Sequence, residues 1–324
     1  MFDVITFGSA TKDIFLHSKE SVVIDSDSFL TKKGVCFSLG SKIKVDDIFF
    51  TSGGGGTNSA ATLAKQGFNV AYCGKIGKDS AGEAVIKDLE QYKVNRDLIS
   101  ETEKRPTNHS IVIDIPDKDR TILVYRGASD LHSKDDVFFE RLNARWFYFA
   151  PFAANASDLF YGLIDFAKLK NVKMMVNPSK SQIREDKIRN VLKNVDILLL
   201  NMEEASLLTK TNYDNENEIL KKVSLLGSEI VLITKGVDGA IVYFKDKFYA
   251  GVPDNPNALD RTGAGDSFGA GFLSEFMKTN CVKKALQFGI ANSTSCVQKM
   301  GAKHGLLNLE SEFKRPEIKE VKIN

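Results

Sequence analysis

Short apolar runs alternate with amphipathic helical segments through the second half of the chain, and this alternation constrains the fold most strongly. Runs of strand length are separated by stretches whose apolar residues recur with helical spacing. The expected strands are 146–149, 172–176, 197–200 and 230–234, and the expected helices between them are 156–169, 183–192 and 216–226. Strands joined in this way form right-handed βαβ crossovers. The pattern predicts an α/β fold with a doubly wound, mostly parallel sheet and helices on both faces.

Two further segments alternate with period two and predict a separate small sheet. Residues 34–50 are expected to form two or three short strands, and residues 109–115 and 121–126 a hairpin. Segments of about 10–50 and 107–126 then make a β-sheet lid. Ligands of parallel α/β sheets bind at the carboxyl ends of the strands, where such a lid can close over them. We expect residues 1–310 to form this domain and residues 311–324 a loosely attached polar tail.

The composition is that of an ordinary globular protein. Hydrophobic residues make up 43% of the 324 residues and charged residues 27%, and the formal net charge is +2. Lysine and arginine are interleaved with acidic residues, so no basic stripe for nucleic acid or an anionic membrane is visible. The four cysteines form no C-x-x-C pair, which predicts free thiols in a reducing cytoplasm. The chain shows no signal peptide and no apolar stretch of about 20 residues, so neither secretion nor a membrane span is expected.

The run 262–268, with sequence T-G-A-G-D-S-F, places two glycines at the start of a helix expected at about 264–278. The N–H groups at a helix start lack intrahelical partners and the helix dipole is positive there, so the place binds anions. Gly263 and Gly265 let a phosphate approach the backbone, and Asp266 in the first turn can accept a hydroxyl proton. The alternative is a glycine-rich entry to a packed helix, with Asp266 as an ordinary first-turn acid.

A second glycine run, Ser52–Asn58, joins a lid strand to a helix. It lacks the Lys-Ser/Thr of a Walker A loop, and its spacing is poor for a dinucleotide fingerprint. A glycine hinge lets a substrate approach the backbone, and the Asn58 amide can donate to and accept from sugar hydroxyls. The alternative is a flexible connection without a ligand.

Three weaker signals lie at the ends of expected strands. Asn201 and Glu204 have the spacing of a capping box, which by itself explains both residues. Segment 234–239 is typical of a turn into a hairpin, where a nucleotide could pack. Asp13 follows a first strand expected at 4–7, and it is either a turn residue or an acid that grips a diol.

In this order the motifs resemble those of the ribokinase-like, or PfkB-type, sugar and nucleoside kinases, from about residue 3 to residue 307. The two specific anchors are Gly53-Gly54-x-Gly56-x-Asn58 and Asp260-x-Thr262-Gly263-Ala264-Gly265-Asp266. The resemblance implies an α/β domain with a β-sheet lid. It also implies transfer of the γ-phosphoryl group of ATP to an alcohol, with magnesium.

The resemblance assigns roles to individual residues. Asp266 is implied as the base that takes the proton of the substrate hydroxyl. The implied anion hole is Gly263, Ala264 and Gly265, and the implied substrate contacts are Asp13, Gly53, Gly54 and Asn58. The implied contacts to magnesium and nucleotide are Asn177, Asn201, Glu204 (to magnesium through water), Thr234, Gly236, Gly239 and Asn292. Part of a monovalent-cation site, for potassium, is matched by Asp260, Thr262 and Gly301.

Three positions depart from the family pattern. Gly55 stands where some relatives carry a lysine, so a charged contact to the substrate is absent. Gly305 stands where a cation-ligating serine often lies, which argues against a need for potassium. Arg261 replaces a more usual threonine.

The favoured function is an ATP-dependent kinase for a primary hydroxyl of a sugar such as ribose or fructose. A nucleoside (adenosine-like) kinase is the rival, and it is favoured if a lid aromatic such as Phe15, Phe37 or Phe49 stacks on a base. A catalytically silent sugar sensor is disfavoured by the intact Asp266, and a nicotinamide dehydrogenase by the missing glycine fingerprint after the first strand. The apolar alternation at 35–50 also predicts that two lids could dock to form a homodimer.

Overall fold

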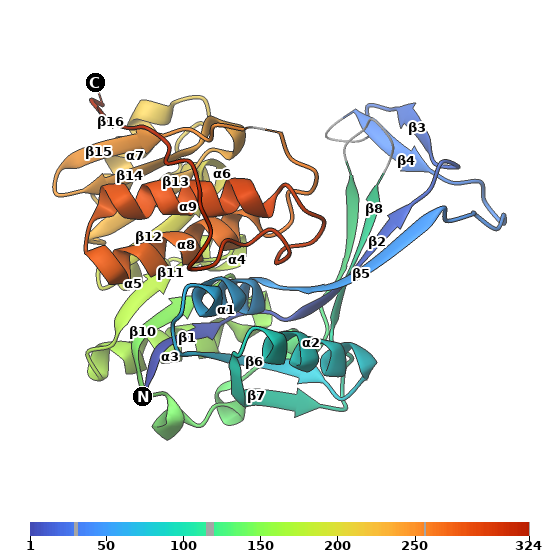
Figure 1. The fold of residues 1–324 in the computed structure, drawn as a ribbon, viewed down its shortest axis with the longest axis horizontal. Coiled ribbons are helices and arrows are strands. Elements are labelled where there is room, and N and C mark those ends of the chain that lie inside the picture. The colour runs from blue at the N-terminus through green and yellow to red at the C-terminus, as the bar shows by residue number, and fades with distance from the viewer. Residues whose placement is uncertain (29–31, 115–119, 256, 324) are drawn as a thin grey trace.

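The computed structural model describes residues 1–28, 32–114, 120–255 and 257–323, and a large sheet lies at its centre (Figure 1). In spatial order its strands are β16 (Ile318–Val321), β15 (Lys247–Gly251), β14 (Ala240–Phe244), β13 (Ile230–Thr234), β12 (Ile197–Asn201), β11 (Lys173–Val176), β10 (Ala144–Phe149), β1 (Phe2–Phe7), β6 (Val70–Gly77) and β7 (Asn95–Thr102). The strands from β13 to β7 are parallel. At the other edge β14, β15 and β16 are antiparallel.

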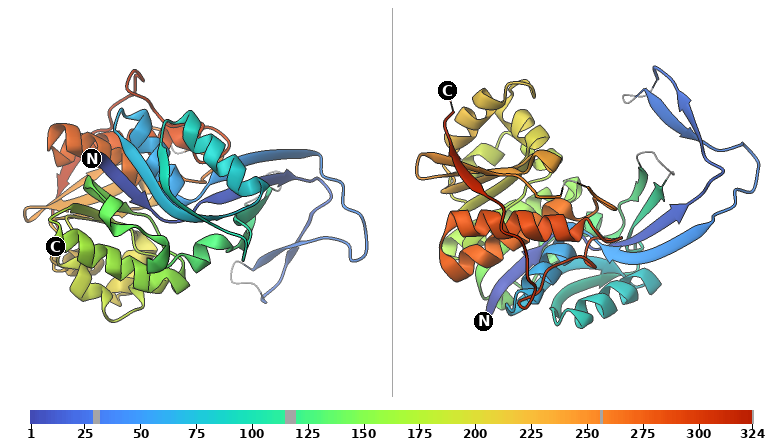
Figure 2. Two further views of the ribbon diagram at one scale, coloured as in Figure 1. Left: turned by 90° about the horizontal axis from the view of Figure 1, so that it is seen from below. Right: turned by 45° about the horizontal axis from the view of Figure 1, so that its top comes forward.

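Helices cover both faces of this sheet (Figure 2). One face packs against α1 (Gly55–Lys65), α2 (Ser80–Gln91), α8 (Ala264–Thr279) and α9 (Val282–Cys296). The other packs against α3 (Ser157–Leu169), α4 (Lys180–Ile183), α5 (Ile188–Leu192), α6 (Met202–Thr209) and α7 (Glu216–Ser224). In β1, Val4 faces the first group of helices and Ile5 the second, and neither is exposed. The predicted doubly wound α/β fold is confirmed.

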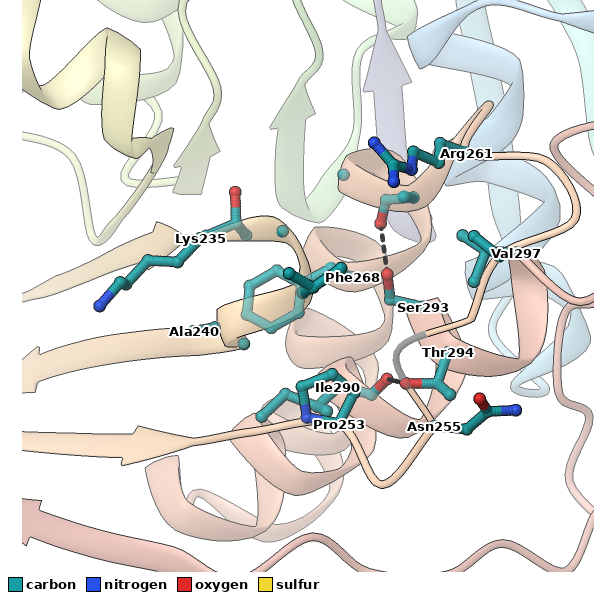
Figure 3. A pocket seen from close by; sticks show the side chains of 17 residues that line it. Lys235, Ala240, Pro253, Asn255, Arg261, Phe268, Ile290, Ser293, Thr294 and Val297 are labelled. Atoms are coloured by element: carbon teal, nitrogen blue, oxygen red, sulfur yellow. Dashed lines mark hydrogen bonds between the residues drawn. The ribbon is translucent and has the colours of Figure 1, made fainter. Parts of the chain in front are cut away.

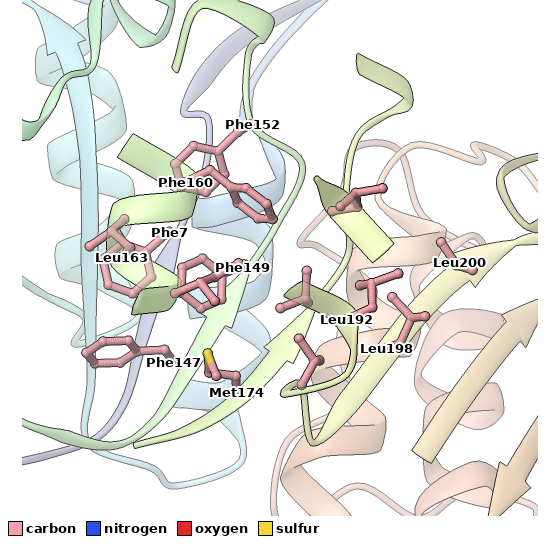
Figure 4. Close-up of a cluster of buried hydrophobic side chains, with 14 of the residues drawn as sticks. Phe7, Phe147, Phe149, Phe152, Phe160, Leu163, Met174, Leu192, Leu198 and Leu200 are labelled. Atoms are coloured by element: carbon pink, nitrogen blue, oxygen red, sulfur yellow. The ribbon is translucent and has the colours of Figure 1, made fainter. Parts of the chain in front are cut away.

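An aromatic cluster fixes the ends of the two central strands on the α3 face (Figure 4). Phe7 and Phe149, the last residues of β1 and β10, lie opposite each other in register. Their rings stack with centroids 5.1 Å apart, and Phe147 meets Phe7 edge-on at the same distance. Such pairs add to the free energy gained from burial. The cluster therefore packs the carboxyl ends of β1 and β10 against each other. These are the strand ends from which the chain continues into the lid and toward α3.

A second sheet of four strands forms the lid, which projects from the α/β body in Figure 1. Its order is β5 (Asp47–Gly53), β2 (Thr11–His17), β8 (Asn108–Asp114) and β9 (Thr121–Tyr125). A two-stranded hairpin of β3 (Val22–Asp25) and β4 (Lys33–Cys36) extends it. Because β2 follows β1 almost directly, the lid begins at the carboxyl end of a central strand.

Some predicted boundaries are wrong. Residues 37–46 form no strand, since Leu39 and Val45 are exposed and nothing buries the alternation. The helix predicted at 183–192 is split into α4 and α5 by the charged run 184–187. Residues 311–324 are not a loose tail, because β16 pairs with β15 along the edge of the sheet. The sequence also gave no signal for β7. Residues 29–31 and 115–119 of the predicted lid segments, residue 256 of the predicted domain and residue 324 of the tail lie outside the described residues.

The predicted free state of the cysteines is found for all four of them. Within the described residues, no helix combines the length and the apolar character that crossing a membrane requires.

Candidate active site

Three segments, which contain Gly55, Ala150 and Asp266, meet at the carboxyl ends of β1 and β10. From this point the sheet is extended in opposite directions, through β6 on one side and β11 on the other. A Cβ atom built on Gly55, the first residue of α1, would lie 3.0 Å from the Cβ of Ala150 and 3.2 Å from Oδ1 of Asp266. Ala150 directly follows β10, and Asp266 lies in the first turn of α8. Open α/β sheets bind ligands at this switch point. The lack of a side chain at Gly55 thus lets the Asp266 carboxylate lie over it.

The start of α8 is open to solvent and to ligands. Gly263 precedes the helix with φ +75°, a conformation that favours glycine, and no side chain caps the N–H groups. The first intrahelical bond runs from the N–H of Ser267 to the Gly263 carbonyl at 2.8 Å, so the N–H groups of Gly265 and Asp266 precede it. A Cβ on Gly265 would meet nothing within 4 Å. The predicted anion site therefore has the free N–H groups and the space that it needs.

Asp266 is held by an amide from α1. The Nδ2 of Asn58 donates to Oδ2 of Asp266 at 2.8 Å. The Oδ1 of the same amide is buried without a hydrogen-bond partner. A buried acceptor without a partner is unfavourable by about 1–3 kcal/mol, so this atom is suited to a hydroxyl donor from a ligand. Desolvation raises the pKa of Asp266, although the Asn58 amide and the charge of Lys303 oppose the rise.

Asp13 lies within the lid sheet and does not follow the first strand as a turn residue, which corrects the placement expected from the sequence. It is in β2, opposite Thr51 of β5 and Ser110 of β8, and it is 4% exposed. A Cβ on Gly53 would lie only 2.0 Å from Oδ2 of Asp13, so a side chain at this position would displace the Asp13 carboxylate. Burial raises the pKa of Asp13 to about 6, although the Ser110 hydrogen bond and Lys303 lower it.

A buried lysine lies near Asp13 and Asp266, and no sequence pattern pointed to it. Lys303 is 1% exposed, and its ammonium donates to Ser52 Oγ and to Asp88 Oδ2, both at 2.7 Å. Burial lowers its pKa, while the charges of Asp88, Asp13 and Asp266 oppose this. Lysine is almost never fully buried unless it is paired. Its position ties the end of lid strand β5 to α2 and to the loop that follows Gly301.

A cavity of about 400 Å³ opens beside the start of α8 (Figure 3). Its walls are mainly apolar, as expected for a site that binds a flat base. It is lined by Thr234, Lys235, Gly236, Val237, Gly239, Ala240, Pro253, Asn255, Ala258, Arg261, Ala264, Gly265, Phe268, Ile290, Ser293, Thr294 and Val297. Three predicted nucleotide contacts, Thr234, Gly236 and Gly239, are among them. Ala264 and Gly265 connect this cavity to the anion site.

Asn292 is also predicted to contact the nucleotide, but it does not line the cavity. It is 0% exposed. Its Nδ2 donates to the Ser267 carbonyl at 2.7 Å, and its Oδ1 accepts from the N–H of Leu307 at 2.9 Å. Both polar ends are used inside the protein, so Asn292 ties α9 to α8. Its neighbour Ser293 lines the cavity and donates to the Ala264 carbonyl at 3.0 Å.

Asn177, Asn201 and Glu204 lie together at the carboxyl ends of β11 and β12. The Asn201 side chain accepts from the Glu204 N–H at 2.8 Å, and the Glu204 carboxylate accepts from the Asn201 N–H at 2.9 Å. The predicted capping box is therefore present. Burial raises the pKa of Glu204, although hydrogen bonds from Asn201 and Asn177 oppose the rise. Carboxylate and amide oxygens are hard ligands that suit magnesium, directly or through water.

Asp260, Thr262 and Gly301 also come together, and hydrogen bonds join them. Oδ1 of Asp260 accepts from the Thr262 N–H at 2.9 Å and from its hydroxyl at 2.7 Å, and Oδ2 accepts from the Gly301 N–H at 2.8 Å. The guanidinium of Arg120, from the lid, also bonds to Oδ1. The guanidinium brings a positive charge to Oδ1, and this charge disfavours a further cation there. No sequence pattern pointed to Arg120, because its partner Asp260 lies 140 residues away along the chain.

Residues 20–308 match the profile of the pfkB family of carbohydrate kinases. The match covers most of the chain, and the chain belongs to this family. Its members are ATP-dependent phosphotransferases that act on sugar hydroxyls.

Individual relatives agree with this assignment. The ribokinase of Staphylococcus aureus is 27% identical over 292 residues, which are 88% of this chain and 94% of that protein. The structure of Arabidopsis thaliana ribokinase complexed with ribose and ATP has a TM-score of 0.78 at 23% identity, over 95% of this chain and 96% of that one. Adenosine kinase from Sinorhizobium meliloti has a TM-score of 0.73 at 20% identity, over 93% and 95%. At these identities the two solved structures share the fold, and the choice between sugar and nucleoside depends on the site.

Proposed function

We propose that the chain transfers the γ-phosphoryl group of ATP to a hydroxyl of a small sugar, ribose- or fructose-like. The observation that carries this proposal is the Asn58 amide. One of its atoms holds Asp266, and the other is a buried acceptor without a partner. A sugar hydroxyl bound beside this pair donates to Asp266, and a second hydroxyl donates to Asn58. The oxygen to be phosphorylated then faces the open start of α8.

The reaction requires little covalent chemistry from the protein. Asp266 takes the hydroxyl proton as the oxygen attacks the γ-phosphorus, and the bond from that phosphorus to the bridging oxygen breaks. ADP leaves with the bond's electron pair. The N–H groups of Gly265 and Asp266 stabilise charge on the transferring group. The raised pKa of Asp266 makes its carboxylate a stronger proton acceptor near neutral pH.

The remaining predicted residues surround this centre. Asp13, 4% exposed and pressed against Gly53, would accept hydroxyls on the far side of the sugar ring. The cavity beside Ala264 and Gly265 would hold the base and ribose of ATP. Glu204, with Asn177 and Asn201, would hold magnesium through water, and magnesium supplies neutralising charge to the β- and γ-phosphate oxygens.

A nucleoside is the second candidate substrate, and the lid aromatics favour it. Phe15 and Phe49 face each other in register, two residues along from Asp13 and Thr51, so both lie on the Asp13 face of the lid. Their ring centroids are 6.1 Å apart, and Phe49 lies 5.6 Å from the ring of His304. An aromatic group of this kind could stack on a base. Phe37 follows the β3–β4 hairpin and is not in this group.

A coupled assay of ADP release with magnesium-ATP tests the proposal. The acceptors are pentoses, hexoses, sugar phosphates and nucleosides. We expect the largest kcat/KM with a free sugar. A nucleoside that exceeds every sugar by more than about tenfold, or 1.4 kcal/mol of transition-state binding, would replace the first candidate with the second. Absence of ADP release with every acceptor would contradict both and favour a catalytically silent sugar sensor.

We also propose that two lids pack together in a homodimer. The apolar residues of β9, namely Ile122, Leu123, Val124 and Tyr125, are each at least 42% exposed. One apolar face of such a strand can cover the site. The opposite face can pack against the lid of a second copy of the chain. Sedimentation at micromolar concentration should show a dimer, and a monomer at every concentration would refute this.

A further inference from the structure

A lid arginine forms an ion pair with the turn that carries the anion site. Arg120 directly precedes β9, and its guanidinium bonds to Asp260, two residues before Thr262. The Asp260 side chain is only 2% exposed and that of Arg120 22%. Pairs this well covered are screened less by water and salt than surface pairs are. The contact therefore links the lid to the start of α8.

The Asp260 carboxylate is already paired with a cation and is crowded at Oδ1. Its two oxygens offer about four lone-pair sites. Oδ1 accepts from three donors, namely the Thr262 N–H, the Thr262 hydroxyl and the guanidinium, and Oδ2 accepts from the Gly301 N–H. A potassium ion bound at Oδ1 would first have to displace Arg120.

A second observation points the same way. A cation site of the kind that the sequence resembles often uses a serine where Gly305 stands. A Cβ built on Gly305 would lie 2.2 Å from the carbonyl oxygen of Ser295 and 2.8 Å from that of Cys296. Atoms that close force the backbone to move, so this backbone cannot accommodate a serine at residue 305.

We propose that the guanidinium of Arg120 is a built-in replacement for a monovalent cation, so that this kinase works without potassium. Arg120 neutralises Asp260 and holds the lid hairpin against the anion-site turn. An arginine suits this role because its charge is permanent and its fork can reach a carboxylate from a neighbouring segment. The role in catalysis rests on the proposed kinase function, whereas the role at Asp260 does not.

The test compares the protein and its Arg120→Met variant in potassium and in tetramethylammonium, which is too large for such a site, at equal ionic strength. Thermal unfolding is the first readout, because it requires no turnover. We expect the unfolding temperature of the unaltered protein to be the same in both salts. The variant should unfold at a lower temperature in tetramethylammonium and recover part of the loss in potassium, or with millimolar guanidinium, which is far below denaturing concentrations.

Turnover is the second readout. In tetramethylammonium the Arg120→Met variant should lose at least about tenfold in kcat, because a largely buried carboxylate is left without its partner. Potassium should restore part of that loss. Arg105→Met is the matched control. Its guanidinium pairs with Asp130 at 3.2 Å with 44% of the side chain exposed, so neither readout should change.

Several results would overturn the proposal. One is strong activation or stabilisation of the unaltered protein by potassium. Another is an Arg120→Met variant that behaves like Arg105→Met in both salts. If Arg120→Met does not fold in either salt, Arg120→Lys decides, since it keeps a cation and should stay indifferent to potassium. A potassium response of Arg120→Lys contradicts the proposal. If no acceptor is phosphorylated, only the kinase function fails, and the unfolding measurements still decide the role of Arg120.

Discussion

The starts of α6 and α8 both face the site, yet they are built in opposite ways. At α6 the side chains of Asn201 and Glu204 bond to each other's backbone N–H groups. At α8 Gly263 offers no side chain, and no side chain caps the N–H groups of Gly265 and Asp266. A helix start is thus available to an anion only where its own side chains leave it uncapped. On this account α8 binds the phosphoryl group through its backbone, and α6 acts through the Glu204 carboxylate.

The largest expected effect removes the base from the α8 start. Asp266→Asn keeps the size of the side chain but cannot accept the hydroxyl proton. We expect kcat to fall by at least about 100-fold with KM nearly unchanged, since a base acts in the transition state. Steady-state kinetics measure both, and thermal unfolding checks that the fold is kept. Near-normal turnover would contradict the assignment of Asp266.

A second substitution places a negative charge at the start of α8, where the phosphoryl group is proposed to bind. A side chain fits at Gly265, because nothing lies within 4 Å of a built Cβ. Gly265→Asp should leave stability unchanged or raise it by about 0.3–1 kcal/mol, because an acid favours a helix start. It should nevertheless lower kcat by roughly tenfold or more through repulsion of the phosphoryl group. Gly265→Asn is the neutral control of equal size. Equal activity in the two variants would mean that no anion binds there.

A substitution at the start of α6 should have a smaller effect, and the quantity that changes should be the magnesium requirement. Glu204→Gln keeps the capping box, because glutamine can occupy the same position. We expect unchanged thermal stability but roughly tenfold more magnesium for half-maximal activity, as is typical for residues that bind a metal through water. The control is Glu203→Gln, an exposed neighbour whose side chain pairs with Lys180. The idea fails if both variants show the same magnesium requirement as the unaltered protein.

The smallest effect is a pH dependence set by Asp13, whose pKa is raised to about 6. Below that pH its carboxylate becomes protonated and stops accepting hydroxyls, so kcat/KM for the acceptor should decline. The contribution of Asp13 to stability has the opposite sign. Its folded-state pKa lies above the unfolded value, so protonation from pH 6 down to about 4 stabilises the folded protein. Asp13→Asn should flatten both profiles, and an unchanged acid limb would assign that limb to Asp266.

The sequence predicted the parts of the fold that depend on local pattern. The strand–helix alternation, the lid hairpin, the helix that follows the Ser52–Asn58 glycine run and the helix expected at about 264–278 are read from periodicity and glycine positions, and the structure has them. It failed where pairing with a distant strand decides the outcome. β16 is only four residues long and half of them are charged, and it is a strand because β15 lies beside it. The alternation at 37–46 has no such partner and stays irregular.

The same distinction holds for the site. The motif positions Asn58 and Asp266 are adjacent in the structure, 208 residues apart in the chain. Lys303 and Arg120 gave no signal, because a lysine or arginine in a mixed-charge sequence is usually a surface group. Only the folded chain shows that Lys303 is buried against Asp88 and that Arg120 reaches Asp260. Asn292 was predicted to contact the nucleotide, but its amide joins α9 to α8. The sequence does not distinguish an asparagine that binds a nucleotide from one that links two helices.

The account's central claim is that the uncapped start of α8 holds the transferring phosphoryl group. Backbone amide NMR of the protein with sugar, magnesium-ADP and aluminium fluoride, a mimic of that group, tests it most directly. We predict downfield shifts of the Gly265 and Asp266 amide protons, which gain a charged acceptor, and little change at Glu204, whose N–H is already bonded to Asn201. Unshifted resonances at Gly265 and Asp266 with the mimic bound would contradict the claim.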